Sequence, residues 1–157
     1  TATELAAALT ENSDEPHAAL LARELTSLRR LTPLTRTRQL ADAIRAILGA
    51  RPPRPAPEGA DDCVRRVFQA LRIAVNVEFG VLDLFLRQLP GCLNAGGRVA
   101  ILTFHSGEDR RVKQAFRAGV HAGLYTTASE EVIRAGPAER RANPRSTSAK
   151  LRWAVRA

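Results

Sequence analysis

The sequence contains few of the features that mark membrane proteins, secreted proteins or metal sites. It has no run of about 18 apolar residues, so we expect no membrane-spanning helix. Its start, TATELAAALTENSDE, lacks the basic region of a signal peptide. Its two cysteines, Cys63 and Cys92, are far apart and belong to no CxxC pair. We therefore expect free thiols in a reducing cytoplasm rather than a disulfide, and we predict neither a metal nor a membrane partner.

The patterns of a complete catalytic site are also missing. The sequence has no glycine-rich GxG or Walker loop and no nucleophile elbow. Gly96 and Gly97 precede an apolar run instead of following one, so we interpret them as a turn and not as a cofactor loop. The chain begins at Thr1, without an initiator methionine and within a helical pattern. We therefore expect a fragment of a longer protein, inactive alone.

Lysine is scarce, whereas arginine is abundant and unevenly distributed. The net charge is +8, and residues 1–50 and 51–109 each carry equal numbers of arginines and acids. Residues 110–157 carry nine arginines, two lysines and three glutamates, which accounts for the whole excess. Such a basic segment favours a polyanionic partner, RNA or DNA. The alternative is the solvated surface of a protein from an arginine-rich proteome.

The first 50 residues have the apolar spacing of a small helical unit. Apolar residues repeat at helical intervals over 18–28 and again over 40–48. Thr35 or Thr37 is predicted to cap the second helix, and Gly49 is predicted to end it. This unit has too little apolar surface to be stable alone, so we expect it to pack on another element.

A proline-rich linker, residues 51–61, separates this unit from residues 62–157. The run RVAILTF is almost wholly apolar, which is typical of a strand that is covered on both faces in a parallel sheet. Helices, a glycine turn and this strand in series predict an α/β fold. The predicted order is helix 62–76, helix 79–89, turn 94–97, strand 98–104 and helix 106–121.

The end of the chain alternates between apolar and polar residues. Leu151, Trp153 and Val155 are separated by Arg152 and Ala154. A period of two predicts a half-buried strand over about 149–156, antiparallel to its neighbour and near a sheet edge. A hairpin partner is predicted at 130–135.

The motif FHSGEDRR, residues 104–111, follows the predicted buried strand. Open α/β sheets bind ligands at this end of their strands, where loops and helix starts meet. Ser106 and Asp109 also fit the start of a helix, as a capping-box-like pair. His105 and Glu108 have no such explanation in the sequence, so they are candidates for catalysis or for ligand contact.

The segment ANPRSTSAKLRW, residues 142–153, combines an Asn-Pro turn with charged and hydroxyl donors that suit phosphate groups. The alternative is an ordinary polar turn before an edge strand whose basic residues discourage aggregation. A third candidate is a polar helix stripe, for which a solvated helix face is the favoured interpretation. This stripe consists of Arg65, Gln69, Arg72 and Asn76.

Three motifs together resemble the RsmH (MraW) family of S-adenosylmethionine-dependent 16S rRNA (cytosine-N4)-methyltransferases. They are FQALRIAVN (68–76), GGRVAILTFHSGEDRRVK (96–113) and NPRSTSAKLR (143–152), and they occur in the family's order with similar spacing. The segments TATELAAAL and TRTRQLADAIR also resemble the helical insertion that this family carries within its methyltransferase domain. The resemblance covers nearly the whole chain.

The resemblance implies an α/β fold: a partial doubly wound (Rossmann-like) methyltransferase sheet, preceded by a small helical insertion domain. Residues 1–50 would be this insertion, which is linked to RNA recognition, and 62–157 the C-terminal part of the methyltransferase domain. It implies methyl transfer from S-adenosylmethionine to the N4 amine of a cytidine in small-subunit rRNA. The cofactor site would lie mainly upstream of Thr1, and the partner would be this RNA or the ribosomal subunit.

The candidate catalytic residues are His105 and Glu108, which would orient the base or accept the proton of its amine. Two alternatives stay open: a non-catalytic, ribosome-associated RNA-binding relative, and a methyltransferase of DNA or small molecules. The basic tail argues against a small substrate. The candidate RNA-binding residues are Arg72, Asn76, Ser106, Arg110, Asn143, Arg145, Ser146, Ser148, Lys150 and Arg152.

Overall fold

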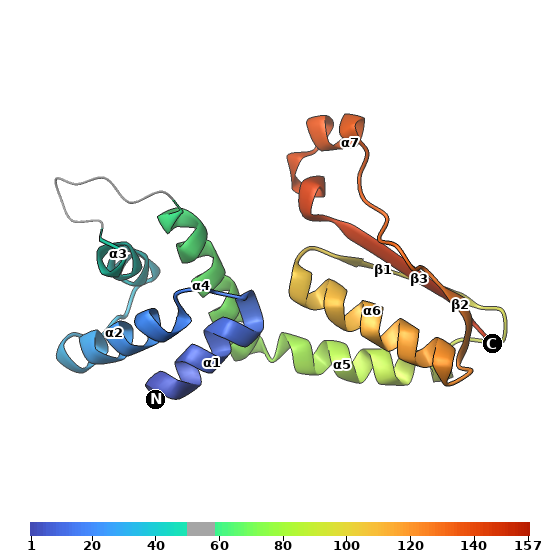
Figure 1. The fold of residues 1–157 in the computed structure, drawn as a ribbon, viewed down its shortest axis with the longest axis horizontal. Coiled ribbons are helices and arrows are strands. Elements are labelled where there is room, and N and C mark those ends of the chain that lie inside the picture. Colours follow the sequence, from blue (N-terminus) through green and yellow to red (C-terminus); the bar gives the residue numbers. More distant parts are fainter. Residues whose placement is uncertain (50–58) are drawn as a thin grey trace. The chain divides into compact units, whose positions relative to one another are not determined.

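A computed structural model describes residues 1–49 and 59–157 (Figure 1). The chain divides into two compact units, Thr1–Glu78 and Phe79–Ala157, and each is described by itself. Most of the linker predicted at 51–61 lies outside the described residues.

In its described residues, 1–49 and 59–78, the first unit contains helices and no strand. It contains α1 (Ala2–Ser13), α2 (Ala18–Leu31), α3 (Thr37–Ile47) and α4 (Ala60–Asn76). The three helices predicted from apolar spacing are therefore present. The helix α4, which the sequence pattern grouped with the C-terminal segment, packs on α1 and α3. It supplies the support that the first 50 residues were expected to need, and the shared core includes Leu9, Leu21, Ile44 and Val67.

The start of α3 differs from the prediction. Its N-cap is Arg36, and neither Thr35 nor Thr37 caps the helix with its side chain. Instead, the amide oxygen of Gln39 accepts hydrogen bonds from the backbone N–H groups of Thr35 (2.9 Å) and Arg36 (3.0 Å). The predicted end is confirmed, because Gly49 follows the helix with φ 103°, a conformation that glycine adopts without strain.

A buried carboxylate links the helices of the first unit. The Glu15 side chain is fully buried, and its Oε2 lies 2.7 Å from Nε of Arg66. Its other oxygen accepts a hydrogen bond from the backbone N–H of His17. Cys63 is buried beside this carboxylate. Burial, with the nearby charge of Glu15, raises the pKa of the Cys63 thiol to about 11.

We expect only one of the two thiols to react in the folded chain. Cys92 is exposed, whereas Cys63 is buried and almost wholly protonated near neutral pH. Since the thiolate is the nucleophile, a maleimide should label Cys92 quickly and Cys63 only after unfolding. The mass of the intact chain before and after denaturation measures this. Rapid double labelling of the native chain would contradict the buried position of Cys63.

The second unit combines helices with a small sheet. Its strands are β1 (Arg98–Thr103), β2 (Tyr125–Ala128) and β3 (Lys150–Arg156), in the order β1-β3-β2. Because β3 is antiparallel to both neighbours, β1 and β2 run parallel and are joined by α6. The other elements of the unit are α5 (Glu78–Gln88), η1 (Leu89–Cys92), α6 (Ser106–His121), α7 (Pro137–Ala142) and η2 (Pro144–Ser148).

The prediction that β1 is paired in parallel and covered on both faces is wrong for this chain. The strand pairs antiparallel with β3. Val99 and Ile101 face the core, which lies on the side of the sheet that carries α5 and α6 (Figure 1). Leu102 and Phe104 are 53% and 54% exposed. In the described part of the chain only one face of the sheet is covered, although β1 is apolar on both.

The strand β3 also differs from its prediction. It is antiparallel, as expected, but it lies between β1 and β2 and not near an edge. Its basic face is the inner one: Arg152 is buried, and Nε of Arg156 donates to the backbone oxygen of Pro90 at 3.0 Å. Both guanidinium groups are hydrogen-bonded there, which offsets part of the cost of removing their charge from water. The predicted partner segment is reduced to a single bridge between Ile133 and Leu151.

Gly119 of α6 is expected not to tolerate alanine, although alanine is usually the better helix former by roughly 0.5–1 kcal/mol. A Cβ at Gly119 would lie 2.6 Å from Cε2 of Tyr125, a buried ring that packs edge-on against Phe116. Gly119→Ala should therefore lower the free energy of unfolding by about 1–3 kcal/mol. Denaturation followed by Trp153 fluorescence measures this, with the exposed Gln114→Ala as control. A stabilised Gly119→Ala variant would contradict the close approach.

Candidate functional site

The sheet brings two of the sequence motifs together at one edge. Thr103, the last residue of β1, pairs with Lys150, the first residue of β3, and its hydroxyl donates to the Lys150 backbone oxygen at 3.3 Å. The segment that leaves β1 (104–111) and the segment that enters β3 (143–149) are therefore neighbours. Figure 1 shows α7 beyond the same end of the strands. The polar groups at this edge come from segments far apart in the sequence.

His105 and Glu108 form the cap of α6, a role the sequence pattern gave to Ser106 and Asp109. His105 is the N-cap, and its Nδ1 accepts from the backbone N–H of Glu108 at 3.4 Å. Oε2 of Glu108 accepts from the backbone N–H of Phe104 at 2.9 Å. Nε2 of His105 lies 3.3 Å from Oε1 of Glu108. The two candidate catalytic residues thus contact each other and fix the backbone where β1 ends.

Asp109 and Arg152 form a buried ion pair that joins α6 to β3. Nε and Nη2 of Arg152 lie 2.7 and 3.3 Å from the two carboxylate oxygens of Asp109. The Arg152 side chain is only 6% exposed and the Asp109 side chain 15%. Nη1 of Arg152 also donates to the backbone oxygen of Glu130 at 3.4 Å. Arg152 was a candidate for RNA contact, but the structure places it inside the unit, where it holds elements of the site together.

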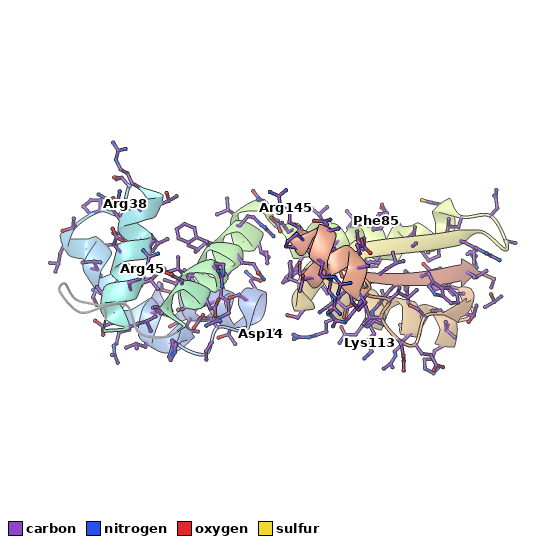
Figure 2. The ribbon with its side chains drawn as sticks, turned by 90° about the horizontal axis from the view of Figure 1, so that it is seen from above. Asp14, Arg38, Arg45, Phe85, Lys113 and Arg145 are labelled. Carbon is purple, nitrogen blue, oxygen red and sulfur yellow. The ribbon has the colours of Figure 1, made fainter. Side chains whose placement is uncertain are left out.

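The segment 143–148 is organised by its own hydroxyl groups. The Ser146 hydroxyl is buried and donates to the backbone oxygen of Asn143 at 2.7 Å. The Ser148 hydroxyl donates to the backbone oxygen of Arg145 at 3.4 Å. The Arg145 side chain is exposed (Figure 2). Ser146 therefore shapes the turn, whereas Arg145 is available to a partner.

A cavity of about 570 Å³ lies at this edge, on the open face of the sheet. Its floor is apolar and includes Leu102, Phe104 and Leu151. Arg134 and Arg145 bring positive charge to its lining, and a volume of this size is ordinary for a small-ligand site. The remaining lining residues are Ile133, Ala135, Glu139, Asn143, Ser146 and Ala149.

Some lining residues were not predicted from the sequence. Phe104 stands beside His105 in the quoted motif, and an aromatic residue at the predicted end of a strand was the available signal. Arg134 lies in the segment 130–135 that was predicted to pair with the last strand, but it was not named as a site residue. Glu139 lies in a segment with no periodic pattern, so nothing in the sequence connected it to this edge. His105 and Glu108 do not line the cavity.

The other candidate RNA-binding residues fall into two groups. Arg72 and Asn76 belong to the first unit, where Arg72 donates to both carboxylate oxygens of Glu78 at 2.9 and 3.0 Å, and Asn76 donates to one of them at 3.1 Å. Ser106, Arg110 and Lys150 lie in the second unit near the cavity edge, at the start of α6 and of β3. Ser106 and Arg110 are exposed, and Lys150 is partly so.

The described residues offer no recognisable cofactor or metal centre. β1 leads directly into the His105 cap of α6, and no glycine-rich loop follows a strand in residues 1–49 or 59–157. Within the same ranges, no three His, Cys, Asp or Glu side chains are grouped as metal ligands would be. No described helix combines the length and apolar character needed to cross a membrane. These residues do not fit an S-adenosylmethionine site, so its location upstream of Thr1 stays a prediction.

Comparison with known proteins identifies relatives over the whole chain. A profile of the MraW methylase family matches residues 1–157. The chain is 45% identical, over 99% of its length, to ribosomal RNA small subunit methyltransferase H 1 of Lachnoclostridium phytofermentans, and it covers 43% of that protein. It is 46% identical to the protein of the same name from Agathobacter rectalis, over 98% of this chain and 44% of the relative.

A more distant relative, from Myxococcus xanthus, is 39% identical over 95% of the chain, which covers 51% of that methyltransferase H. The chain thus spans about half of these relatives' length or less. The resemblance inferred from the three motifs is confirmed. This chain belongs to the MraW methylase family.

Proposed function

We propose that this chain is the C-terminal portion of a cytoplasmic enzyme that transfers a methyl group from S-adenosylmethionine to the N4 amine of a cytidine in small-subunit (16S) rRNA. The observation that supports this most is the cavity where β1 ends, with its apolar floor and arginines at its lining. RNA matches these two properties, because the flat faces of its bases stack on apolar surfaces and its phosphates attract arginines. The names of the relatives support the same reaction class.

Within the cavity, the target cytosine is held against Phe104 and Leu151. Enzymes that modify a base inside RNA take it out of its stack and pack it between apolar or aromatic side chains. Arg134 and Arg145 neutralise the phosphates on either side of the extruded nucleotide. Asn143 presents an amide to the edge of the base. S-adenosylmethionine supplies the methyl group, and the residues of this chain supply the position of the acceptor amine.

The nucleoside product tests this function. The full-length enzyme, incubated with small-subunit RNA and radiolabelled S-adenosylmethionine, is expected to label the RNA. Digestion to nucleosides should place the label in N4-methylcytidine. Labelled DNA, or RNA labelled at another base, would contradict the proposed substrate. RNA binding without any methyl transfer would favour a non-catalytic ribosome-associated relative instead.

The catalytic assignment of His105 and Glu108 stays a prediction, and Glu108→Gln separates it from capping. A glutamine at this position still accepts a hydrogen bond from the Phe104 backbone, so the helix cap is retained. If Glu108 accepts the proton of the amine, kcat should fall by about 10²–10⁴ and the pH profile should change.

His105→Asn is the companion variant, because asparagine caps helices well but titrates no proton. It should lower kcat if the imidazole takes part in catalysis. Wild-type kcat and an unchanged pH profile in both variants would restrict this pair to positioning Phe104.

A further inference from the structure

Among the described residues that line the cavity where β1 ends, one is acidic, Glu139. The other lining residues are apolar, neutral or positively charged. Arginines surround Glu139 in the sequence, at positions 134, 140, 141 and 145. In the described residues, the Glu139 carboxylate nevertheless forms no ion pair and accepts no hydrogen bond. An unpaired acid in a cavity that is proposed to bind a polyanion therefore requires an explanation.

The structure of the unit does not provide this explanation. The neighbouring acids are engaged: Glu108 accepts from the Phe104 backbone, and Asp109 is paired with Arg152. Glu139 lies in the first turn of α7, where negative charge is favourable, but α7 has only six residues and no side chain caps its start. The acid also weakens the attraction of the cavity for phosphates. Its position is explained if the substrate carries a group that a carboxylate binds.

Glu139 and Asn143 both line the cavity and are held one helical turn apart. The backbone N–H of Asn143 donates to the backbone oxygen of Glu139 at 2.7 Å. Side chains four residues apart are neighbours on one side of a helix. The pair therefore offers a carboxylate, which only accepts hydrogen bonds, beside an amide, which can donate them. Cytosine has the matching edge, because its N4 amine donates and its N3 accepts. Uracil has the reverse: its O4 accepts and its N3–H donates.

We propose that Glu139 determines the choice of base: its carboxylate accepts a hydrogen bond from the N4 amine of the target cytosine and repels O4 of uracil. This rests on the proposed function, because it concerns the base held in the same cavity. Acidic side chains recognise the amine of cytosine in nucleic acids. A carboxylate that faces O4 brings lone pairs against lone pairs, and repulsion of the wrong partner is a source of specificity. This role transfers no proton, so it is distinct from the one predicted for Glu108.

Three RNA fragments that differ only in the target base test this role. They carry cytosine, uracil or pyrimidin-2-one, which has a hydrogen at C4 in place of the amine or the oxygen. Each is bound to the full-length enzyme in the presence of S-adenosylhomocysteine, which has no methyl group to transfer, and its Kd is measured. The parent enzyme should bind the cytosine fragment about 10-fold or more tightly than the uracil fragment, with pyrimidin-2-one between them.

Glu139→Gln separates the two bases most clearly, because its amide can accept from the amine of cytosine or donate to O4 of uracil. It should bind the two fragments within about 3-fold of each other, since the repulsion of uracil is removed. Glu131→Gln is the matched control. It removes the same charge from an exposed acid that does not line the cavity. It should change the three Kd values by one common factor and keep the cytosine preference.

Glu139→Asp and thermal melting exclude a merely structural effect. Aspartate keeps the charge but draws the carboxylate back by one methylene, so its cytosine preference should lie between those of the parent and of Glu139→Gln. Because Glu139 is exposed and has no partner in the described residues, all three variants should melt close to the parent temperature.

A cytosine preference that Glu139→Gln retains, or that Glu131→Gln loses to the same degree, would overturn the inference while leaving the proposed function intact. A parent enzyme that methylates cytidine but binds the three fragments equally would also overturn it. If the full-length enzyme does not methylate small-subunit RNA at all, the proposed function itself fails, which is a different outcome.

Discussion

Replacing Asp109 with alanine is expected to lower the free energy of unfolding of the Phe79–Ala157 unit by about 3–5 kcal/mol. The change leaves the Arg152 guanidinium buried without its carboxylate, at a position that is 6% exposed. The backbone oxygen of Glu130 still accepts one hydrogen bond from Arg152 but does not neutralise its charge. Unfolding followed by fluorescence of Trp153, the only tryptophan, reports on this unit.

Asp83→Ala is the matched control for Asp109→Ala. Asp83 also pairs with an arginine at 2.7 Å, Arg111 of α6, but both side chains of that pair are about one-third exposed. The same loss of one negative charge should therefore cost about 1 kcal/mol or less. Arg152→Lys keeps the charge and loses the paired geometry, so it should fall between the two. Equal losses for Asp109→Ala and Asp83→Ala would contradict the role given to the buried pair.

Replacing Phe104 with alanine is expected to lower kcat/KM for RNA methylation by about 10- to 100-fold in the full-length enzyme. Stacking of a base on an aromatic ring contributes roughly 1–3 kcal/mol, or about 5- to 150-fold in rate, and the expected loss lies within these limits. Phe104 lies on the cavity floor and is about half exposed, so its truncation should change the folding stability far less than it changes turnover. Leucine at this position keeps an apolar surface and should restore part of the activity.

Phe85→Ala provides the control for Phe104→Ala. Phe85 lies on α5, is exposed to a similar degree and does not line the cavity (Figure 2). This variant should keep the parent kcat/KM. An unchanged rate for Phe104→Ala, or an equal loss for both variants, would show that the base does not stack on Phe104.

Helices were predictable from the sequence because their signal is local. The apolar spacing over 62–76 and 106–121 corresponds closely to α4 and α6. The strand 98–104 was placed almost correctly, but its partner and its burial were not. An apolar run indicates that a strand is suited to burial on both faces. Whether a second layer is present depends on other segments, and in the described residues only one face is covered.

The site shows a similar limit. The local motifs predicted a site at the end of the strand 98–104. In the structure, the pairing of Thr103 with Lys150 brings the motif 104–111 next to the motif 142–153. The pairing of Asp109 with Arg152 spans 43 residues, so the sequence could not distinguish a buried arginine from an RNA contact. The alternation of β3 suggested that its basic residues face outward, because arginine is rarely buried without a partner. The partner of Arg152 is Asp109, which belongs to the other motif, FHSGEDRR.

Photocrosslinking tests most directly whether a cytosine occupies the cavity at the end of β1. An RNA fragment that carries 5-iodocytidine at the methylated position is bound to the full-length enzyme and irradiated, and the adduct is mapped by mass spectrometry. We expect an adduct on Phe104 that the Phe104→Ala variant loses and the Phe85→Ala variant keeps. An adduct confined to residues outside the cavity lining would contradict it.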